Sequence, residues 1–201
     1  IYSALYACHE VNCMGREDFQ TGIDNQMAFD RLVNQISARF LNIDVKLLET
    51  EINNSLEQIG KYFNLDRIYY YSFSEDGTIM KLSYEWCHDG VGSKSGSMQD
   101  ELAYAFPWMM RKIRSDEYIV ISDVSSLPED AAFEKEMLYR DDIKSCLIIP
   151  LKADGIVWGF IGFDAIRHSL VWDTDCICAV QTLGEVFLSN QINGLKEERL
   201  R

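Results

Sequence analysis

Two apolar runs separated by a polar turn constrain the fold of this chain more than any other feature. The runs are Ser145–Leu151 and Ile156–Phe163, and Asp154-Gly155 lies in the turn between them. Runs rich in β-branched and aromatic residues around an Asp-Gly turn predict a β-hairpin, in which the glycine accepts a positive φ. Because neither run alternates between apolar and polar residues, both strands are expected to be buried on both faces. The rest of the chain must therefore cover each face of a sheet.

The segments around this hairpin predict a second hairpin and several helices. Asp66–Phe73 and Thr78–Trp86 have the aromatic and β-branched content of strands, and an Asp-Gly turn joins them. The helical spacing of apolar residues and the capping residues give the remaining elements. They are a helix from about Phe29 to Asn42, a helix capped by Asp44 that extends to Phe63, a helix from Pro107 to Arg114, a short strand from Tyr118 to Ser122, a helix that a capping box at Ser126–Glu129 opens and that ends near Tyr139, and a long helix capped by Asp173 that extends toward Lys196.

The order of these elements predicts an α+β fold with a central antiparallel β-sheet. The terminal helices are expected to cover one face of the sheet. A layer of loops and short helices between Cys87 and Tyr139 is expected to cover the other face, with a pocket between that layer and the sheet. The predicted domain spans residues 27–194. It follows an N-terminal extension at 1–26 and precedes a tail or the start of a connector helix at 195–201.

The composition disfavours several classes of partner. The 32 acidic residues outnumber the 19 basic ones, and the net charge of -13 repels nucleic acid phosphates and anionic membrane surfaces. The apolar runs are shorter than the roughly 18 residues of a membrane-spanning helix. Six cysteines scattered over 201 residues favour free thiols in a reducing compartment. We therefore expect a cytoplasmic location, no nucleic acid partner and no membrane insertion of this segment.

Short motifs follow one another along residues 27–193 in an order and at a spacing that are typical of one known family. They are Leu65-Asp66-Arg67, Tyr84-Glu85-Trp86-Cys87, Phe106-Pro107-Trp108, Ser122-Asp123-Val124, Ile143-Lys144-Ser145, Trp158 to Asp164, and Leu183 to Phe187. In this arrangement the chain resembles the GAF sensor domains of bacterial signalling proteins. The resemblance is greatest to GAF domains upstream of histidine kinases, as in two-component systems, or of cyclic-di-GMP enzymes.

The resemblance implies a non-catalytic sensory domain that binds a small ligand and controls an attached output domain through its terminal helices. The implied partners are a second copy of the chain, which forms a homodimer through the first and last helices, and the output domain in cis. Residues two apart in a strand share a face, so Tyr69 lies beside Tyr71 and Cys146 beside Ile148. Similarity to phytochrome-type GAF domains implies that these faces look into the ligand pocket. The predicted ligand-binding residues are Tyr69, Tyr71, Cys146 and Ile148, with Trp86 and Trp108 as walls.

Two other functions fit the same residues. One is a thiol enzyme that resembles the GAF-fold reductases of free methionine sulfoxide, with Cys87 as the nucleophile. Against it, His88 is adjacent in the strand and therefore points to the opposite face, and no second cysteine is near in the sequence. The other is a purely structural dimerisation module, in which side chains such as Tyr71 and Trp108 fill the pocket.

The sequence predicts no cofactor and no metal site. Phytochrome-type relatives attach a bilin through a cysteine, and the matching segment here, Ser125–Met137, contains none. A bilin is therefore disfavoured, although an unidentified small ligand remains expected. Cyclic nucleotide binding is disfavoured because Phe163-Asp164 stands where that group of relatives has an Asn-Lys pair. Cys8, His9 and Cys13 offer three metal-ligating side chains where a tetrahedral site needs four.

Overall fold

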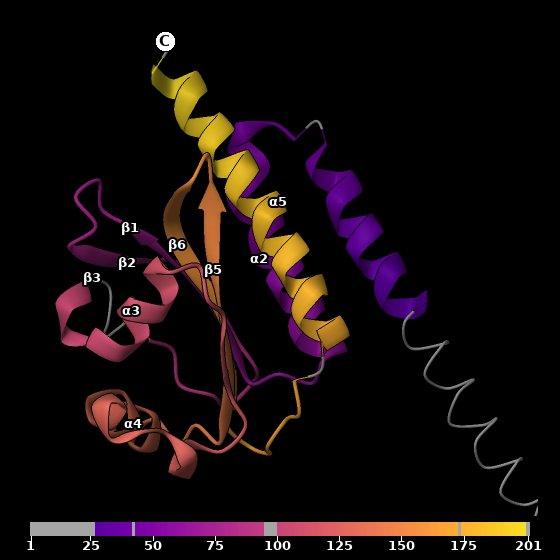
Figure 1. Ribbon diagram of the computed structural model, residues 1–201. Helices are drawn as coiled ribbons and strands as arrows, with labels where there is room; N and C mark the ends of the chain where they lie inside the picture. The colour runs from indigo at the N-terminus through magenta and orange to yellow at the C-terminus, as the bar shows by residue number, and fades with distance from the viewer. Residues whose placement is uncertain (1–26, 42, 95–99, 173, 200–201) are drawn as a thin grey trace, which may run out of the picture.

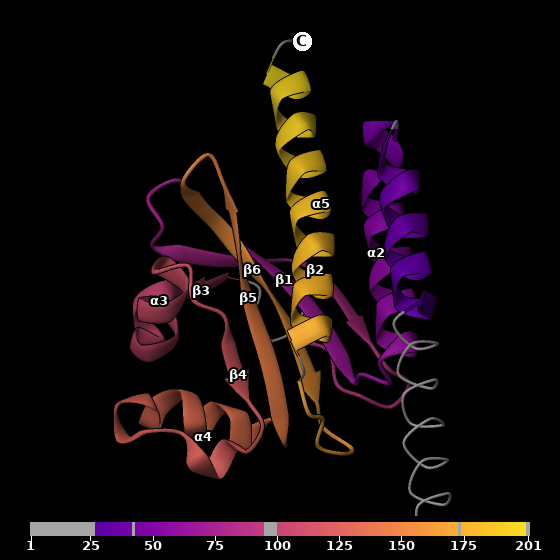
Figure 2. The ribbon, with the colours of Figure 1, turned by 45° about the vertical axis from the view of Figure 1, so that its right-hand side comes forward.

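A sheet runs through the centre of the molecule, and each of its faces is covered (Figure 1). The computed structural model describes residues 27–41, 43–94, 100–172 and 174–199. Six strands form the sheet in the order β3-β2-β1-β6-β5-β4, and each neighbouring pair is antiparallel. Helices lie on one side and a layer of short helices and loops on the other (Figure 2). The predicted α+β architecture is confirmed.

Both predicted hairpins form the centre of the sheet. The first consists of β1 (Arg67–Phe73) and β2 (Ile79–Cys87), and the second of β5 (Ser145–Ala153) and β6 (Ile156–Ala165). In the turn of the second hairpin, Gly155 has a φ of 78° and Asp154 a φ of 52°. The edge strands are β4 (Ile119–Ile121) and β3 (Asp100–Leu102). The sequence analysis did not predict β3, because its three residues, Asp-Glu-Leu, show no strand pattern and form their ladder with β2 alone.

Two helices, α2 (Val45–Tyr62) and α5 (Thr174–Arg199), lie on one face of the sheet (Figure 1). A helix at residues 27–40 packs against them, with Phe29 against Tyr62 of α2 and Phe40 against Phe187 of α5. The Asp44 side chain caps α2 as predicted, because it accepts a hydrogen bond of 2.9 Å from the Lys46 backbone N–H. The predicted cap Asp173 lies outside the described residues. The α5 helix continues past residue 194 and ends beyond the edge of the sheet (Figure 2).

Two short helices, α3 (Pro107–Arg114) and α4 (Ala132–Arg140), form the layer over the opposite face. The bounds of α3 are those predicted, but the predicted start of α4 is wrong. Two 3-10 turns, η2 (Val124–Ser126) and η3 (Glu129–Ala131), precede α4 where the sequence predicted a capping box. The Ser126 hydroxyl donates to the Asp123 carbonyl at 2.7 Å, and Pro128 is extended, so the helix begins only after η3.

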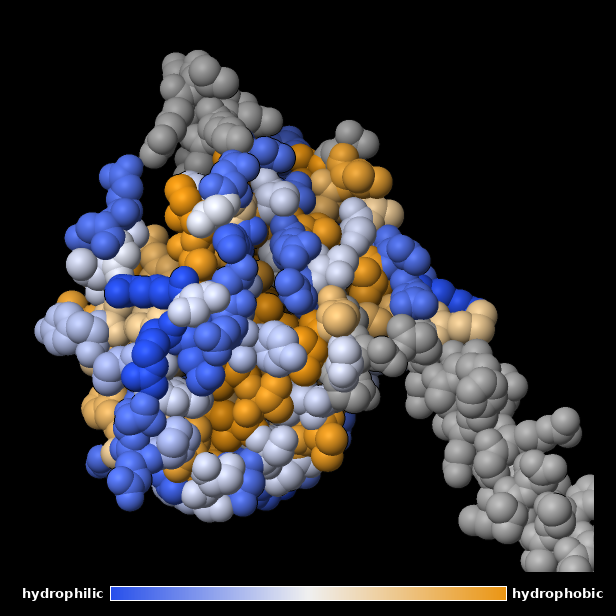
Figure 3. Space-filling view, in the orientation of Figure 1, coloured by the Kyte–Doolittle hydropathy of each residue, from blue (hydrophilic) through white to orange (hydrophobic). Residues whose placement is uncertain are grey.

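On the face shown in Figure 3, hydrophobic side chains are interspersed among hydrophilic ones. None of the helices that the structure describes combines the length and the apolar character needed to cross a bilayer.

Candidate functional site

A cavity of about 70 Å³ lies between the sheet and the α3–α4 layer. The sheet supplies its floor through β1, β5 and β6, and α3 and α4 supply its roof. Most of the lining is apolar. The uncharged lining residues are Tyr69, Tyr71, Met80, Phe106, Trp108, Met109, Ile121, Met137, Leu138, Ile143, Ile148 and Phe160, and the charged ones are Lys94, Glu101, Glu134 and Asp141.

Aromatic rings shape the floor of the cavity. The Tyr71 ring stacks on that of Phe160, with centroids 5.2 Å apart and an interplanar angle of 16°. The Tyr69 ring meets Tyr71 edge-on at 5.8 Å. Gly162 lies opposite Tyr69 in the neighbouring strand β6, and a Cβ atom at that position would stand 2.2 Å from the Tyr69 ring. The absence of a side chain at Gly162 therefore lets Tyr69 lie flat across β6.

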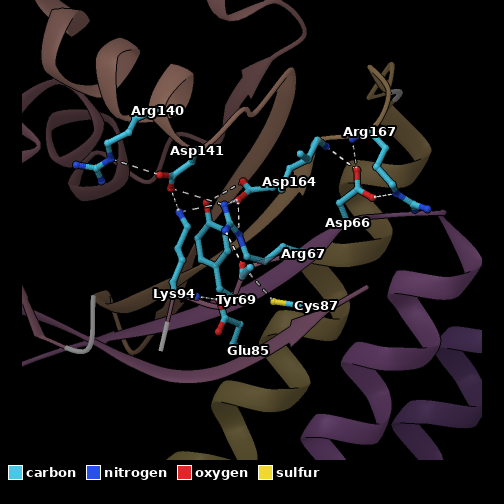
Figure 4. Close-up of polar contacts among 12 residues, drawn as sticks. Asp66, Arg67, Tyr69, Glu85, Cys87, Lys94, Arg140, Asp141, Asp164 and Arg167 are labelled. Atoms are coloured by element: carbon cyan, nitrogen blue, oxygen red, sulfur yellow. Dashed lines mark hydrogen bonds and ion pairs between the residues drawn. The ribbon is translucent and has the colours of Figure 1, made fainter. Parts of the chain in front are cut away.

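A buried ion pair fixes the inner end of the floor (Figure 4). Asp164 is fully buried at the end of β6, and its Oδ2 accepts hydrogen bonds from Arg67 Nε at 2.9 Å and Nη2 at 2.7 Å. The Tyr69 hydroxyl donates to Asp164 Oδ1 at 3.2 Å. A buried carboxylate requires such partners because its charge is otherwise costly to desolvate. The network therefore determines the orientation of Tyr69.

Burial raises the pKa of the Tyr69 hydroxyl well above its ordinary value, and the Asp164 carboxylate raises it further. The hydroxyl therefore stays protonated at physiological pH and can donate to Asp164. Lys94 lies at the rim of the same cluster. Its Nζ is 3.9 Å from Asp164 Oδ2, 3.6 Å from Asp141 Oδ2 and 4.7 Å from the centroid of the Tyr69 ring. Lys94 and Asp141 also border an open cleft of about 440 Å³ on the outside of the cluster.

Glu134 connects the two helices of the roof. It belongs to α4, its side chain is buried, and its Oε1 accepts the backbone N–H groups of Trp108 at 2.9 Å and Met109 at 3.1 Å. These groups lie in the first turn of α3, where backbone donors have no partner within the helix. The other oxygen, Oε2, is buried and accepts no hydrogen bond from any residue in the described ranges.

The structure brings four of the six predicted ligand-binding residues together. Tyr69, Tyr71, Trp108 and Ile148 line the cavity. A purely structural module would require side chains such as Tyr71 and Trp108 to fill the cavity, and in this structure they line it and leave it open. Cys146 lies on the same face but is fully buried in the core under α3 and does not line the cavity. Whether these residues bind a ligand stays a prediction.

The expected position of Trp86 is wrong. Its side chain packs on the helical face, where a Cβ at Gly60 of α2 would lie 2.1 Å from the indole ring. Trp86 pairs with Ile68, which belongs to the core under the helices. The register of β1 and β2 shifts between Tyr70 and Tyr71. This irregularity changes which alternate residues of β2 face the cavity, so Leu82 packs against the core on the cavity side of the sheet, whereas Trp86 packs against the core under the helices.

The environment of Cys87 opposes a role as a nucleophile. Burial raises the pKa of its thiol to about 11, with a further contribution from the Glu85 carboxylate. The thiolate is the reactive form of cysteine, and it is scarce at neutral pH when the pKa is this high. The Cys87 Sγ atom lies 3.8 Å from the Gly92 carbonyl oxygen, as part of the contact between β2 and the following loop.

Sequence reasoning missed the charged members of the site. The missed residues are Arg67, Lys94, Glu101, Glu134, Asp141 and Asp164. One signal was present, because an aspartate within a strand that is otherwise apolar needs a buried partner. No comparable signal in the sequence indicates that Glu134 is buried, because it is one of several charged residues in a short polar helix.

Within the described ranges, no group of three His, Cys, Asp or Glu side chains is placed to hold a metal ion. The cluster of Cys8, His9 and Cys13 lies outside the described residues.

The family of the chain follows from its match to a family model. The model of the GAF domain matches residues 47–187, which is more than half of the chain. The chain belongs to the GAF domain family. The match includes both hairpins, both short roof helices and most of α5, so the cavity lies within the matched part of this GAF domain. Domains of this family are generally regulatory and not catalytic.

A curated relative and several solved structures are similar to this GAF domain. The methanogenesis regulatory histidine kinase FilI of Methanothrix harundinacea is 26% identical over 176 residues, which cover 81% of this chain and 19% of the relative. The chain thus spans about a fifth of that protein. The phycocyanobilin-bound GAF domain from a cyanobacterial phytochrome matches with a TM-score of 0.69 and 17% identity, covering 84% of this chain and 96% of that one. The photosensory core module of Stigmatella aurantiaca phytochrome matches with a TM-score of 0.64 and 18% identity, covering 81% and 36%.

These solved structures are 17% and 18% identical to the chain and show that it shares their fold, so the expectation that a bilin is disfavoured stays a prediction. The cavity of about 70 Å³ is smaller than the roughly 300–1,000 Å³ of pockets for drug-sized ligands. The open cleft of about 440 Å³ shares Lys94 and Asp141 with it.

Proposed function

We propose that this GAF domain is a sensory domain that binds a small ligand in the cavity and controls an attached output domain through α5. The observation that carries the proposal is the position of the cavity over strands whose opposite face supports α5. Phe160 of β6 and Ile148 of β5 face the cavity, whereas Ile161 and Leu151 of the same two strands lie under α5 at Gly184. A change in the cavity therefore has a short physical route to the last helix.

Close packing makes this route effective. A Cβ atom at Gly184 would lie 2.4 Å from the Leu151 side chain and 3.5 Å from that of Ile161. The helix backbone thus lies directly on the central hairpin, and densely packed interfaces transmit small displacements instead of absorbing them. Since α5 continues beyond the sheet, a shift of the hairpin would move the end of the helix that leads toward residue 199.

The proposed output domain is a histidine kinase. This part of the proposal is supported by the similarity to a regulatory histidine kinase, of which the chain spans 19%. A cyclic-di-GMP enzyme remains the alternative from the resemblance of the sequence motifs.

The proposed assembly is a homodimer through the first helix and α5. Met27 is 48% exposed and Leu41, just after the first helix, is 73% exposed. The outer face of α5 is polar at Gln181, Glu185 and Ser189. We therefore expect α5 to contribute to the dimer near its C-terminal end.

Filling the cavity tests the function. Ile148→Phe places additional volume in the cavity, and Ile156→Phe makes the same change at a residue that is 60% exposed in the same hairpin. Both variants would be made in the longer protein that contains this domain, and autophosphorylation would be measured with and without small-molecule mixtures.

Ile148→Phe is expected to abolish the response to ligand, and Ile156→Phe is expected to retain it. A response that survives in Ile148→Phe, in a variant whose thermal unfolding shows a folded domain, would contradict ligand sensing through this cavity.

A further inference from the structure

The carboxyl group of Glu134 gives the cavity a specific polar requirement. Its side chain is only 5% exposed. One oxygen holds the first turn of α3, and the other, Oε2, accepts no hydrogen bond from the described residues. Buried acceptors without a donor destabilise a protein, so nearly all of them have a partner in the functional state. Because Glu134 lines the cavity, a ligand that turns this carboxyl group toward the cavity can supply the missing donor.

The charges around the cavity favour a cation. Its lining contains the carboxylates of Glu101, Glu134 and Asp141 and a single ammonium group, that of Lys94. Lys94 lies within ion-pair distance of Asp141 and of the buried Asp164, at 3.6 and 3.9 Å, so the charges of Lys94 and Asp141 offset each other and the carboxylates of Glu101 and Glu134 remain. The Glu134 carboxylate accepts hydrogen bonds from the backbone N–H groups of Trp108 and Met109, and Oε2 has no partner among the described residues. A cationic ligand would therefore be attracted, and an anionic one repelled.

The apolar part of the lining suits an alkylammonium ion. The aromatic residues Tyr71, Phe160 and Trp108 line the cavity, and aromatic rings attract cations. Lys94 already illustrates this interaction, because its Nζ lies 4.7 Å from the centroid of the Tyr69 ring. The volume limits the size of the ligand. About 70 Å³ corresponds to on the order of five positions of the size of a water molecule.

We propose that the ligand is a small alkylammonium ion whose N–H group donates to Glu134 Oε2 and whose alkyl group contacts the aromatic floor. This inference rests on the proposed function and specifies the chemical class of its ligand. It also explains how binding would be read out, because the same carboxylate holds α3 and α4 together through Trp108 and Met109. Pulling Glu134 toward a cation changes the strength of that connection.

Three probes of similar size and different charge test the proposal on the wild-type chain. Propylammonium, 1-propanol and propionate would each be titrated to about 10 mM and followed by calorimetry and by NMR of the backbone amides. Ligands with so few atoms bind no tighter than about 40 μM. We expect propylammonium to bind at least about tenfold more tightly than 1-propanol, and propionate not to bind. The amides of Trp108 and Met109 should shift on binding.

Two matched variants test the role of Oε2. Glu134→Gln retains an oxygen that can accept from Trp108 and Met109 but presents an amide N–H₂ in place of Oε2. It should weaken propylammonium binding by about tenfold or more. Glu136→Gln removes the same charge from the exposed side of α4 and should change binding by less than about twofold. Thermal unfolding establishes that both variants are folded. If Glu134→Gln does not fold, the order of the three probes on the wild type decides alone.

The outcomes separate this inference from the proposed function. If 1-propanol or propionate binds as tightly as propylammonium, the ammonium assignment is overturned while ligand binding in the cavity stands. Equal weakening by the two glutamine variants would also overturn it, because a long-range charge effect would then replace the contact at Oε2. If no probe binds, the assignment is overturned, and the Ile148→Phe experiment decides the proposed function independently.

Discussion

The buried pair of Arg67 and Asp164 permits a quantitative test of how the floor of the cavity is held. Asp164→Asn keeps the shape of the side chain and removes its charge, which leaves a guanidinium group that is only 5% exposed without its main counter-ion. Removing one partner of a buried pair typically costs about 3–5 kcal/mol. Asp141 Oδ2 remains 3.8 Å from Arg67 Nη2, so we expect a loss near about 3 kcal/mol, at the lower end of that range.

Urea denaturation followed by tyrosine and tryptophan fluorescence measures this loss, and thermal unfolding provides a second measurement. For a domain of this size, a loss of about 3 kcal/mol lowers Tm by roughly 6–12 °C. The matched control is Asp130→Asn, which removes the same charge from the exposed Arg111–Asp130 pair, whose atoms lie 2.5 Å apart. Exposed pairs contribute less than about 1 kcal/mol, so this variant should unfold almost like the wild type.

The double substitution Arg67→Met/Asp164→Leu extends the test. Replacing both members of a buried pair by apolar side chains is often close to neutral, and the double variant should therefore be more stable than Asp164→Asn. Tyr69 loses its acceptor in that variant, so recovery is expected to be partial. A loss below about 1 kcal/mol for Asp164→Asn, or a double variant less stable than the single one, would refute the reasoning.

Three further predictions concern the rest of the sheet. Gly162→Ala should destabilise the domain by about 1–3 kcal/mol in denaturant unfolding, since its Cβ would collide with the Tyr69 ring; an unchanged midpoint would show that the ring moves freely. Alkylation of Cys87 by iodoacetamide, identified by its loss in Cys87→Ser, should be slow at pH 7 and should accelerate toward pH 11. The reason is that the raised pKa keeps the thiol protonated at lower pH. Fast alkylation at pH 7 would show that the pKa is not raised. Hydrogen bonds from Ser74 and Thr78 lower the pKa of Asp76 to about 2. The wild type should therefore be more stable than Asp76→Asn above pH 4, and this difference in unfolding free energy should shrink as the pH falls toward 2. A difference that stays constant between pH 4 and pH 2 would contradict the assignment.

The local signals in the sequence were sufficient for most elements of the fold. The Asp-Gly turn at Asp154-Gly155 requires positive φ, which few residues adopt, and this requirement places the central hairpin together with the apolar runs on each side. Asp44 and Pro107 act on backbone groups one to three positions away, and both helices begin where those residues predict. The predicted start of α4 was wrong because the extended Pro128 and two 3-10 turns stand in place of the expected capping box.

The candidate site depended on features that only the tertiary structure decides. The face of Trp86 depends on a shift in the pairing between β1 and β2, and no local rule determines where that shift falls. The sequence placed Tyr69, Tyr71, Trp108 and Ile148 around one cavity because strand alternation and family resemblance indicate which faces meet. Glu134 became part of the site only because α4 packs over the first turn of α3 and turns an ordinary helical glutamate inward. Periodicity governs which residues are buried together, whereas the partner of a buried charge is set by contacts between segments distant in the sequence.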